Sequence, residues 1–275
     1  VGTTLIISTR TPDGRAMGAP GAGSRGAADA EPLDRALRWL YEEVNALWTP
    51  RAIPRLPGPP TPLDFLRDHI LLSAPCVVTC AMRGADWQGA MERWDLDGIV
   101  DAMGDVPVTV NLTPDGLGDA VDAAGRFVRP HEARMQLADF AQRLRAPPAG
   151  APAVPYLSVQ DDNLRREHAA LAPDVPAAVP WFQAAVGTPP AAVNLWVGDD
   201  RSVTTAHADT FENLYCVIRG AKRFVLLPPT DAIGEDLRPR PAAHYQPGPD
   251  GQRLEAVPDS PPAGSGGGDA GPTVP

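Results

Sequence analysis

The stretch NLWVGDDRSVTTAHADTFENLYCVIRGAKRFVLLPPTD, residues 194–231, decides the fold class of this chain. From Ala192 onward, runs of β-branched and aromatic residues alternate with short polar connections. We expect four strands here: AVNLWVG (192–198), SVTTAHAD (202–209), ENLYCVIRG (212–220) and KRFVLLPP (222–229). Short strands with tight connections are typical of an antiparallel barrel or sandwich.

A two-residue hairpin loop at Gly220-Ala221 is expected between the last two strands. In that register Lys222 faces Arg219, and the alternation of side chains puts six residues on one face of the sheet: Asn213, Tyr215, Val217, Lys222, Phe224 and Leu226. A lysine on such an apolar face is costly unless an anion binds it. Lys222 is therefore a candidate carboxylate-binding residue with Thr204 as a hydroxyl partner, although a register slip of one residue would turn it outward.

His207 and Asp209, in the sequence HAD, are the candidate metal ligands. Residues two apart in a strand lie on the same side, so one imidazole nitrogen and one carboxylate oxygen face the same point. With a distant His, such a pair forms the facial triad of non-haem Fe(II) oxygenases, which leaves positions open for a cosubstrate and O2. The one histidine after His207 is His244, in a proline-rich stretch that we expect to be a loop. A loop histidine without a metal is the simpler interpretation of His244, with the third ligand as the alternative.

The order of motifs resembles the JmjC/cupin-8 family of Fe(II)/2-oxoglutarate oxygenases. H-x-D, N-L-Y-C-V, G-x-K and L-x-P-P carry the resemblance, which extends upstream through IPRLPGPPTPLDFLRDHILLSAPCVV, VNLTPDGLGDAV and YLSVQDDNLRRE and covers about residues 53–260. It implies a mainly β fold with α-helices: a double-stranded β-helix, the cupin-like jelly-roll barrel, preceded by N-terminal helices. The family's third ligand is a His on a late strand, followed by a closing N-F-W-Y-like strand, and no segment here resembles either. We therefore expect a truncated chain whose barrel is incomplete at the C-terminus.

The resemblance also implies a role for six residues. Two would be the catalytic iron ligands: His207 and Asp209. Four would bind or flank 2-oxoglutarate: Lys222 at its C5 carboxylate, Thr204 as the hydroxyl partner of that lysine, Asn213 near the cosubstrate, and Tyr156 in the wall of the pocket. Ser158 competes with Tyr156 for the last place.

Fe(II)-dependent hydroxylation of a protein side chain is the activity that the resemblance implies. The members that this chain resembles most imply (3S)-lysyl hydroxylation of GTPases of the translation-factor family. Two alternatives stay open: a truncated jumonji-like binding module, weak or inactive because it lacks the third ligand, and a cupin that binds another metal. The unpaired edges of a half-barrel would favour poor solubility or a homodimer.

Composition and charge limit the partners. The chain has 24 Lys and Arg against 34 Asp and Glu, a formal charge of -10, and such a surface repels nucleic acid and favours a basic peptide or protein. No apolar run approaches the roughly 20 residues of a membrane span. The three cysteines suit a reducing compartment. A cytoplasmic or nuclear protein is expected, with an organellar transit peptide in the Ala-, Gly- and Arg-rich start as the alternative.

Four parts are predicted along the chain: low-complexity disorder in 1–30, an N-terminal α/β part in 31–150, the barrel in 151–260 and a disordered tail in 261–275. An amphipathic helix packed on the core is expected over Glu31–Trp48, with a partner-binding helix as the alternative, from apolar residues at helical spacing: Leu33, Leu37, Leu40, Val44 and Leu47. Order is expected to decay after Asp231. His131 and His168 are expected at the surface.

Overall fold

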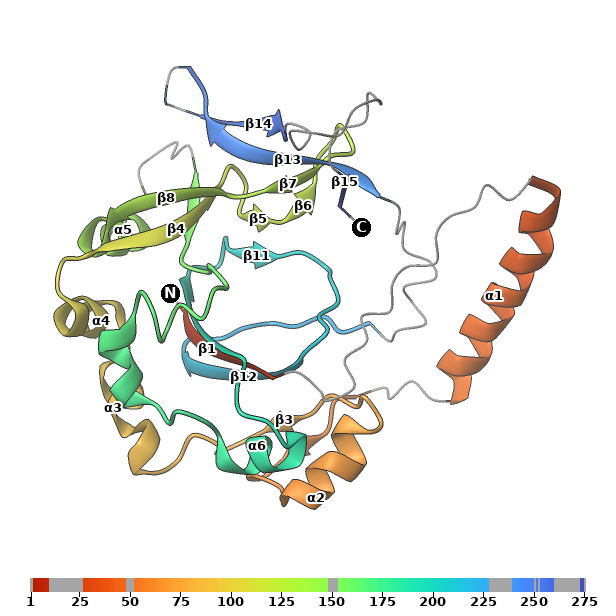
Figure 1. Ribbon diagram of the computed structural model, residues 1–275, viewed down its shortest axis with the longest axis horizontal. Coiled ribbons are helices and arrows are strands. Elements are labelled where there is room, and N and C mark those ends of the chain that lie inside the picture. The colour runs from red at the N-terminus through yellow and green to blue at the C-terminus, as the bar shows by residue number, and fades with distance from the viewer. Residues whose placement is uncertain are drawn as a thin grey trace.

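The computed structural model describes residues 2–9, 27–47, 52–147, 153–227, 239–249, 251, 253–259 and 273–274 (Figure 1). Its helical segments are α1 (Ala27–Leu47), α2 (Pro62–Phe65), η1 (Leu66–Ile70), α3 (Ala85–Arg93), α4 (Leu96–Met103), α5 (Leu137–Arg145), η2 (Ala169–Asp174) and α6 (Pro180–Val186). Its strands are β1 (Gly2–Thr9), β2 (Arg55–Leu56), β3 (Val77–Val78), β4 (Pro107–Thr113), β5 (Leu117–Gly118), β6 (Ala120–Val121), β7 (Phe127–Arg129), β8 (His131–Gln136), β9 (Val154–Tyr156), β10 (Ala192–Gly198), β11 (Val203–Thr204), β12 (Glu212–Arg219), β13 (Arg240–Pro247), β14 (Leu254–Pro258) and β15 (Thr273–Val274).

The strands form separate small sheets within the described ranges. The orders are β10-β1-β12, β8-β4-β9, β11-β5, β2-β3, and β14-β13-β7-β6 with β15 beside β13. An isolated bridge between Leu157 and Val197 connects the end of β9 to β10. The expected mixture of sheet and helix is therefore present, but in the described part of the chain the sheets do not close into one barrel. Incompleteness at the C-terminus stays a prediction.

β1 is the central strand of the sheet that carries much of the candidate site. It pairs antiparallel with β10, from Gly2 opposite Gly198 to Ser8 opposite Ala192. Its other edge pairs antiparallel with β12 and ends with Thr9 opposite Glu212. The prediction of disorder throughout residues 1–30 is thus wrong for Gly2–Thr9, and also for residues 27–30, which form the start of α1. The reason is local, because TTLIIST is rich in β-branched residues, whereas the Gly- and Pro-rich stretch that follows dominated the composition of the window.

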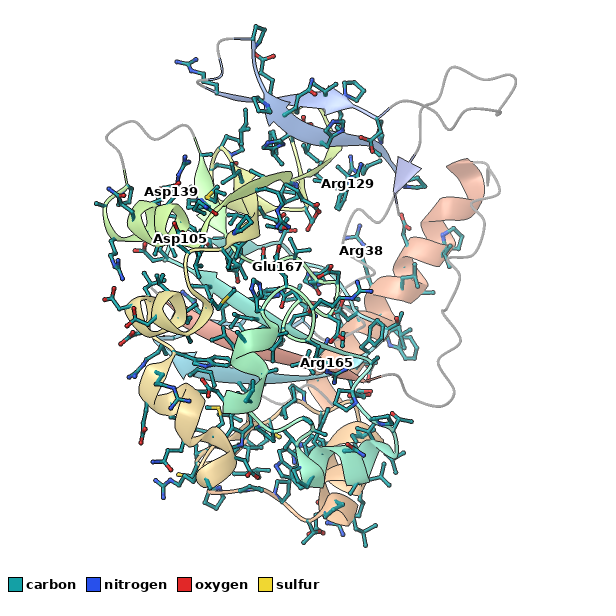
Figure 2. The ribbon with its side chains drawn as sticks, turned by 60° about the vertical axis from the view of Figure 1, so that its left-hand side comes forward. Arg38, Asp105, Arg129, Asp139, Arg165 and Glu167 are labelled. Atoms are coloured by element: carbon teal, nitrogen blue, oxygen red, sulfur yellow. The ribbon has the colours of Figure 1, made fainter. Side chains whose placement is uncertain are left out.

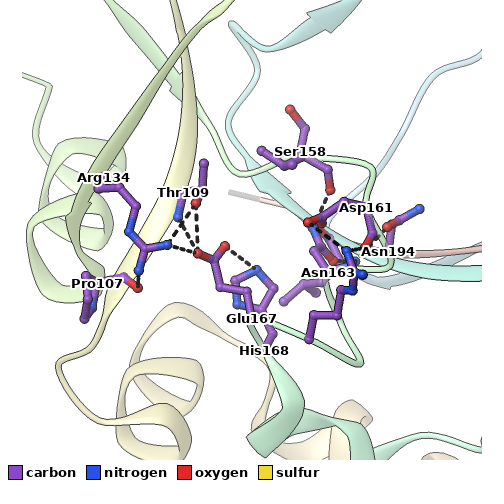
Figure 3. A network of polar contacts seen from close by, with 12 residues as sticks. Pro107, Thr109, Arg134, Ser158, Asp161, Asn163, Glu167, His168 and Asn194 are labelled. Carbon is purple, nitrogen blue, oxygen red and sulfur yellow. Dashed lines mark hydrogen bonds and ion pairs between the residues drawn. The ribbon is translucent and has the colours of Figure 1, made fainter.

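The outer edge of β10 is covered by side chains instead of a further strand. Asp162 Oδ1 accepts a hydrogen bond from Val193 N at 2.7 Å, and Asn163 Oδ1 accepts one from Leu195 N at 2.7 Å. The Asn163 amide group also donates to Leu195 O at 3.0 Å, and Asn194 Oδ1 accepts from the backbone N–H of Asp162 (Figure 3). These contacts satisfy an edge that would otherwise be open to pairing with another chain.

The core lies where helices α3 to α6 pack against β4, β9 and β10. Its largest fully buried side chains include Trp94, Phe140, Leu137, Leu157, Leu164, Leu171 and Leu195. The Trp94 indole N–H donates to Asp174 Oδ2 at 3.0 Å, and Arg93 forms an ion pair with the same carboxylate. The polar atom of the buried indole is therefore satisfied, and η2 is fastened to the end of α3.

Helix α1 confirms the predicted helix but not its predicted packing. Figure 1 shows it standing apart from the sheets. Several of its large apolar side chains are exposed, with 63% of Trp39 and 42% of Leu40 open to solvent, while Leu37 and Val44 are half-buried. The expectation that this helix packs on the core is therefore wrong. Among the described residues, no helix combines the length and the apolar character that are needed to cross a membrane.

Two further predictions for the C-terminal half are wrong. Residues 221–227 form no strand, and Ala221 lacks the positive φ that a type I′ turn needs at both loop residues, whereas Gly220 has a φ of 76°. The stretch around His244 is strand β13, which pairs with β14 and β7, so order does not simply decay after Asp231. Its prolines, Pro241 and Pro247, lie near the ends of the strand, where a missing N–H costs least.

Ile6→Pro tests the central place of β1. Ile6 lies between Asn194 of β10 and Tyr215 of β12. Proline removes an N–H from a strand that has hydrogen-bonded neighbours on both edges. We therefore expect the free energy of unfolding to fall by about 1–3 kcal/mol. Ile6→Val is the control, since it keeps the N–H and β-propensity. Urea unfolding followed by circular dichroism measures both, and equal stability of the two variants would contradict the paired position of β1.

Candidate functional site

His207 and Asp209 lie together on an exposed segment between β11 and β12. His207 Nε2 is 3.8 Å from Asp209 Oδ1, and the two side chains are 50% and 46% exposed. The predicted strand 202–209 is shorter than expected, because only Val203–Thr204 is extended. The expected juxtaposition of one imidazole nitrogen and one carboxylate oxygen is nevertheless present.

Hydrogen bonds fix both of these side chains from behind. His207 Nδ1 lies 2.8 Å from Thr205 O, and Asp209 Oδ2 accepts from Asn213 Nδ2 at 2.8 Å. A ring that donates from Nδ1 to a carbonyl presents the lone pair of Nε2 outward, which is the tautomer that binds metal. Thr205 is itself anchored, since its hydroxyl donates to Asp119 O at 2.7 Å.

Lys222 is the cation at the other end of the site. It is partly buried, its Nζ donates to the Tyr156 hydroxyl at 3.1 Å, and Nζ lies 5.3 Å and 5.6 Å from the ring centroids of Tyr156 and Trp196. Burial lowers the pKa of the Lys222 ammonium. Within the described residues no carboxylate forms an ion pair with it, so the charge is held by a hydroxyl and two aromatic faces.

An aromatic row extends from Tyr156 across the sheet. Edge-to-face contacts join Tyr156 to Trp196 at 5.5 Å, Trp196 to Tyr215 at 5.9 Å and Tyr215 to Phe224 at 4.7 Å between ring centroids. Burial raises the pKa of both tyrosines, while a hydrogen bond with Thr204 opposes the rise for Tyr156. The phenols therefore stay neutral and can donate hydrogen bonds. Phe224 thus contacts Tyr215, as a shared face requires, whereas Lys222 contacts Tyr156 and Trp196, and no strand ladder holds either residue.

A cavity lies between Tyr156, Trp196 and Thr204 on one side and residues of β4 and β5 on the other. It is lined by Tyr156, Trp196, Thr204, Asn111, Ser158, Asp119 and their neighbours. Trp196 is 5% exposed, and its buried indole N–H has no hydrogen-bond partner among the described residues. A buried donor without an acceptor is costly and needs an explanation, which a bound ligand with acceptor oxygens would supply.

Tyr156 and Ser158 were the two alternatives for the residue in the wall of the 2-oxoglutarate pocket, and both line the cavity. The Tyr156 hydroxyl contacts Lys222, whereas Ser158 Oγ accepts from Asn111 Nδ2 at 3.0 Å. The structure therefore brings Tyr156, Thr204 and Lys222 together, and it places Asn213 at Asp209 instead of inside the cavity.

His244 does not lie with His207 and Asp209, the candidate ligand pair that is called the metal pair below. Its Nδ1 lies 2.6 Å from Asp259 Oδ1, and Asp259 also forms an ion pair with Arg129 at 2.8 Å, close to the β13–β14 sheet (Figure 2). Nowhere in the described ranges do three His, Cys, Asp or Glu side chains come together as a complete metal site. The structure thus shows two donors of a possible set and leaves the third unidentified.

His168 corrects the prediction of a surface histidine. Its side chain is fully buried, burial lowers its pKa, and neither ring nitrogen has a hydrogen-bond partner in the described part of the chain. The adjacent Glu167 accepts hydrogen bonds from Thr109 and forms an ion pair with Arg134 (Figure 3). The neighbouring charges in REHAAL suggested exposure, but Glu167 turns to β4 and β8 while His168 turns to the core.

Thr205 and Asp119 are the site residues that the sequence did not reveal. Thr205 follows Thr204 without a motif of its own, and Asp119 lies far away in the chain in GDAV. They meet because β5 and β11 pair in parallel, with Gly118 opposite Thr204. Only knowledge of that pairing could have identified them.

The donor set fits a divalent transition metal with a diacid beside it. Bonds of about 2.1 Å from one ion can span donors up to about 4.2 Å apart, so His207 Nε2 and Asp209 Oδ1 can reach the same ion. One imidazole and one carboxylate are ligands that non-haem iron accepts. The half-buried Lys222, which lies over the cavity-lining rings of Tyr156 and Trp196, suits a carboxylate group.

Comparison with known proteins identifies the family. The model of the cupin-like domain matches residues 62–262, which is more than half of the chain. This chain belongs to the cupin-like, or JmjC, domain family. The family implies a jelly-roll β fold, of which the described residues show sheets that stay open.

Three members show how far the similarity extends. A human "bifunctional peptidase and (3S)-lysyl hydroxylase JMJD7" is 39% identical over 204 residues, which are 74% of this chain and 63% of that protein. An Arabidopsis thaliana "lysine-specific demethylase JMJ32" is 37% identical over 75% of this chain and 59% of its own length. A Dictyostelium discoideum "JmjC domain-containing protein E" is 33% identical over 62% and 51%. The JmjC chain thus spans about half to three fifths of these relatives.

Gly198→Ala tests how tightly the JmjC cavity wall is packed. A Cβ at Gly198 would lie 2.7 Å from Tyr156 Cδ2 and 2.8 Å from Ser202 Oγ. The ring that holds Lys222 must then shift, and such overpacking costs about 1–3 kcal/mol. We expect a lower melting temperature and altered near-UV circular dichroism of the aromatic row. Gly118→Ala is the matched control, because the nearest atom to its Cβ is 3.8 Å away. Equal melting of both variants would refute this packing.

Proposed function

We propose that this JmjC protein is an Fe(II)- and 2-oxoglutarate-dependent oxygenase that hydroxylates a lysyl side chain of a protein. The observation that carries the proposal is the partly buried Lys222, which lacks an acidic partner among the described residues and lies against an aromatic row whose Tyr215 is within range of the charge of Asp209. A buried cation without a counter-ion is unfavourable in the free protein and becomes favourable when an anion binds. A cosubstrate with two carboxylates meets that requirement.

His207 Nε2 and Asp209 Oδ1 would hold the metal ion. When bound, the ion would supply the oxidation in which O2 converts 2-oxoglutarate to succinate and CO2 while one oxygen atom enters a substrate C–H bond. The protein would hold these two ligands in place through hydrogen bonds, one from His207 to Thr205 O and one from the Asn213 amide to Asp209. Such outer hydrogen bonds orient metal ligands and tune their basicity.

The cosubstrate would lie between the metal pair and Lys222. The ammonium of Lys222 would bind the distal carboxylate, with the hydroxyls of Thr204 and Tyr156 as further donors, since Tyr156 is neutral. The Trp196 indole N–H offers one more donor. The aromatic row keeps this end of the cavity apolar, and a low local dielectric strengthens each charge-assisted hydrogen bond.

A lysine substrate is supported by the relatives and by the charge of the chain. Two of the similar proteins are named as acting on lysine, one as a hydroxylase and one as a demethylase. The formal charge of -10 favours a basic protein partner. The mass of a reacted peptide separates the activities, because hydroxylation adds one oxygen atom and demethylation removes a methyl group.

Lys222→Met tests the cosubstrate site. We expect the affinity for 2-oxoglutarate, measured by calorimetry in the presence of Mn(II), to fall by about 2 kcal/mol or more, which is about 30-fold in Kd. The melting temperature should stay equal or rise, since a desolvated charge is replaced by an apolar chain of similar length. Because burial lowers the pKa of Lys222, wild-type binding should also weaken with rising pH before an ordinary lysine would lose its proton.

Arg223→Met is the matched control, since Arg223 is the exposed neighbour of Lys222. It removes one positive charge at an adjacent position and should leave the affinity unchanged. Undiminished binding in Lys222→Met would overturn the assignment of this residue. A wild-type protein that binds Mn(II) and 2-oxoglutarate but forms no succinate with any lysine peptide would favour the alternative of a non-catalytic binding module.

A further inference from the structure

We infer that Asp119 is the residue that selects a positively charged side chain at the metal pair. This inference rests on the proposed function and adds to it a protein group that would recognise the substrate. Asp119 is the one charged residue among those that line the cavity beside Tyr156, Trp196 and Thr204. Its backbone has a φ of 53°, an uncommon conformation that asparagine and aspartate tolerate better than other residues with a side chain.

Asp119 is held next to His207 by one short chain of contacts. Gly118 pairs with Thr204 across β5 and β11, and the Thr205 hydroxyl donates to Asp119 O at 2.7 Å. Thr205 O in turn accepts from the imidazole of His207 at 2.8 Å. The same threonine therefore positions the backbone of Asp119 and the ring of His207, so that an ammonium group at the Asp119 carboxylate would hold a neighbouring C–H bond near the metal pair.

The carboxylate of Asp119 is open to a partner. Its side chain is exposed at the mouth of the cavity, and within the described residues it forms no hydrogen bond or ion pair. Two basic side chains act on its charge, His207 and Arg129, and Arg129 is already ion-paired at 2.8 Å with Asp259. An unneutralised carboxylate beside a cavity attracts a cation from solution.

Two groups of opposite charge therefore lie at the residues of this cavity. Lys222 Nζ is 5.3 Å and 5.6 Å from the ring centroids of Tyr156 and Trp196, which line it, and Asp119 lines the cavity itself within range of the charge of His207. Trp196 lines the same cavity, and its buried indole N–H has no hydrogen-bond partner among the described residues. A diacid is attracted to Lys222, and a substrate that carries an ammonium or guanidinium group is attracted to Asp119.

Asp119→Asn removes the charge with little change in shape, and asparagine tolerates the same positive φ. The probes are Nα-acetyl-lysine methylamide and its norleucine analogue, which differ by the ammonium group. The full chain is loaded with Mn(II) and 2-oxoglutarate, and paramagnetic relaxation of the side-chain protons of each probe measures its binding near the metal. In wild type the lysine probe should bind about tenfold more tightly than the norleucine probe, and Asp119→Asn should abolish that preference.

Asp101→Asn is the control, because it removes an exposed carboxylate on α4 away from the cavity and should keep the lysine preference. Loss of preference in Asp119→Asn with unchanged affinity for Mn(II) and 2-oxoglutarate supports the assignment. A preference that survives Asp119→Asn, or equal binding of both probes to wild type, overturns it while leaving the proposed function intact. Absence of enhanced water relaxation by Mn(II) in wild type overturns the proposed function itself.

Discussion

The site depends on the two ladders that β1 makes with β10 and β12. These strands do not pair with each other, and β1 lies between them over seven paired positions on each side. Trp196 on β10 and Tyr215 on β12 meet across β1, with 5.9 Å between ring centroids. The aromatic row that receives Lys222 therefore exists only while the first residues of the chain hold two distant strands in register. Backbone hydrogen bonds supply that geometry, because an antiparallel ladder fixes both spacing and facing side.

A second constraint comes from the opposite edge of β10. Asp162 and Asn163 donate and accept the hydrogen bonds that a neighbouring strand would otherwise provide. The loop that carries these residues is itself fastened to β4 and β8 through Glu167 (Figure 3). β10 is thus rigid on both sides, which suits a strand that presents Trp196 to a cavity, since sites on rigid elements keep their geometry better than sites on loops.

Much of the site could be predicted from sequence, because its residues lie close together in the chain. His207, Asp209 and Lys222 carry a recognisable spacing, and the alternation in β12 places Tyr215 on the face where Lys222 also lies. The predictions that failed depend on pairing between strands that are far apart in the sequence. No local signal shows that Gly2–Thr9 enters between β10 and β12, or that Asp119 reaches His207 through β5. His168 failed for another reason, since charged neighbours in sequence do not determine which side chain turns inward.

The two parts of the site differ in exposure, and they should therefore differ in how strongly they bind. His207 and Asp209 are exposed, whereas Lys222 is partly buried. His207 and Asp209 are about half exposed, so water competes for the ion and two protein donors alone hold it weakly. Lys222, Tyr156 and Trp196 are more sheltered, so a carboxylate gains more there than it would at the surface. A diacid anchored first by Lys222 would bring its other end to the metal pair at high effective concentration. The cosubstrate can then help to retain the ion, so that metal and 2-oxoglutarate stabilise each other's binding instead of binding independently.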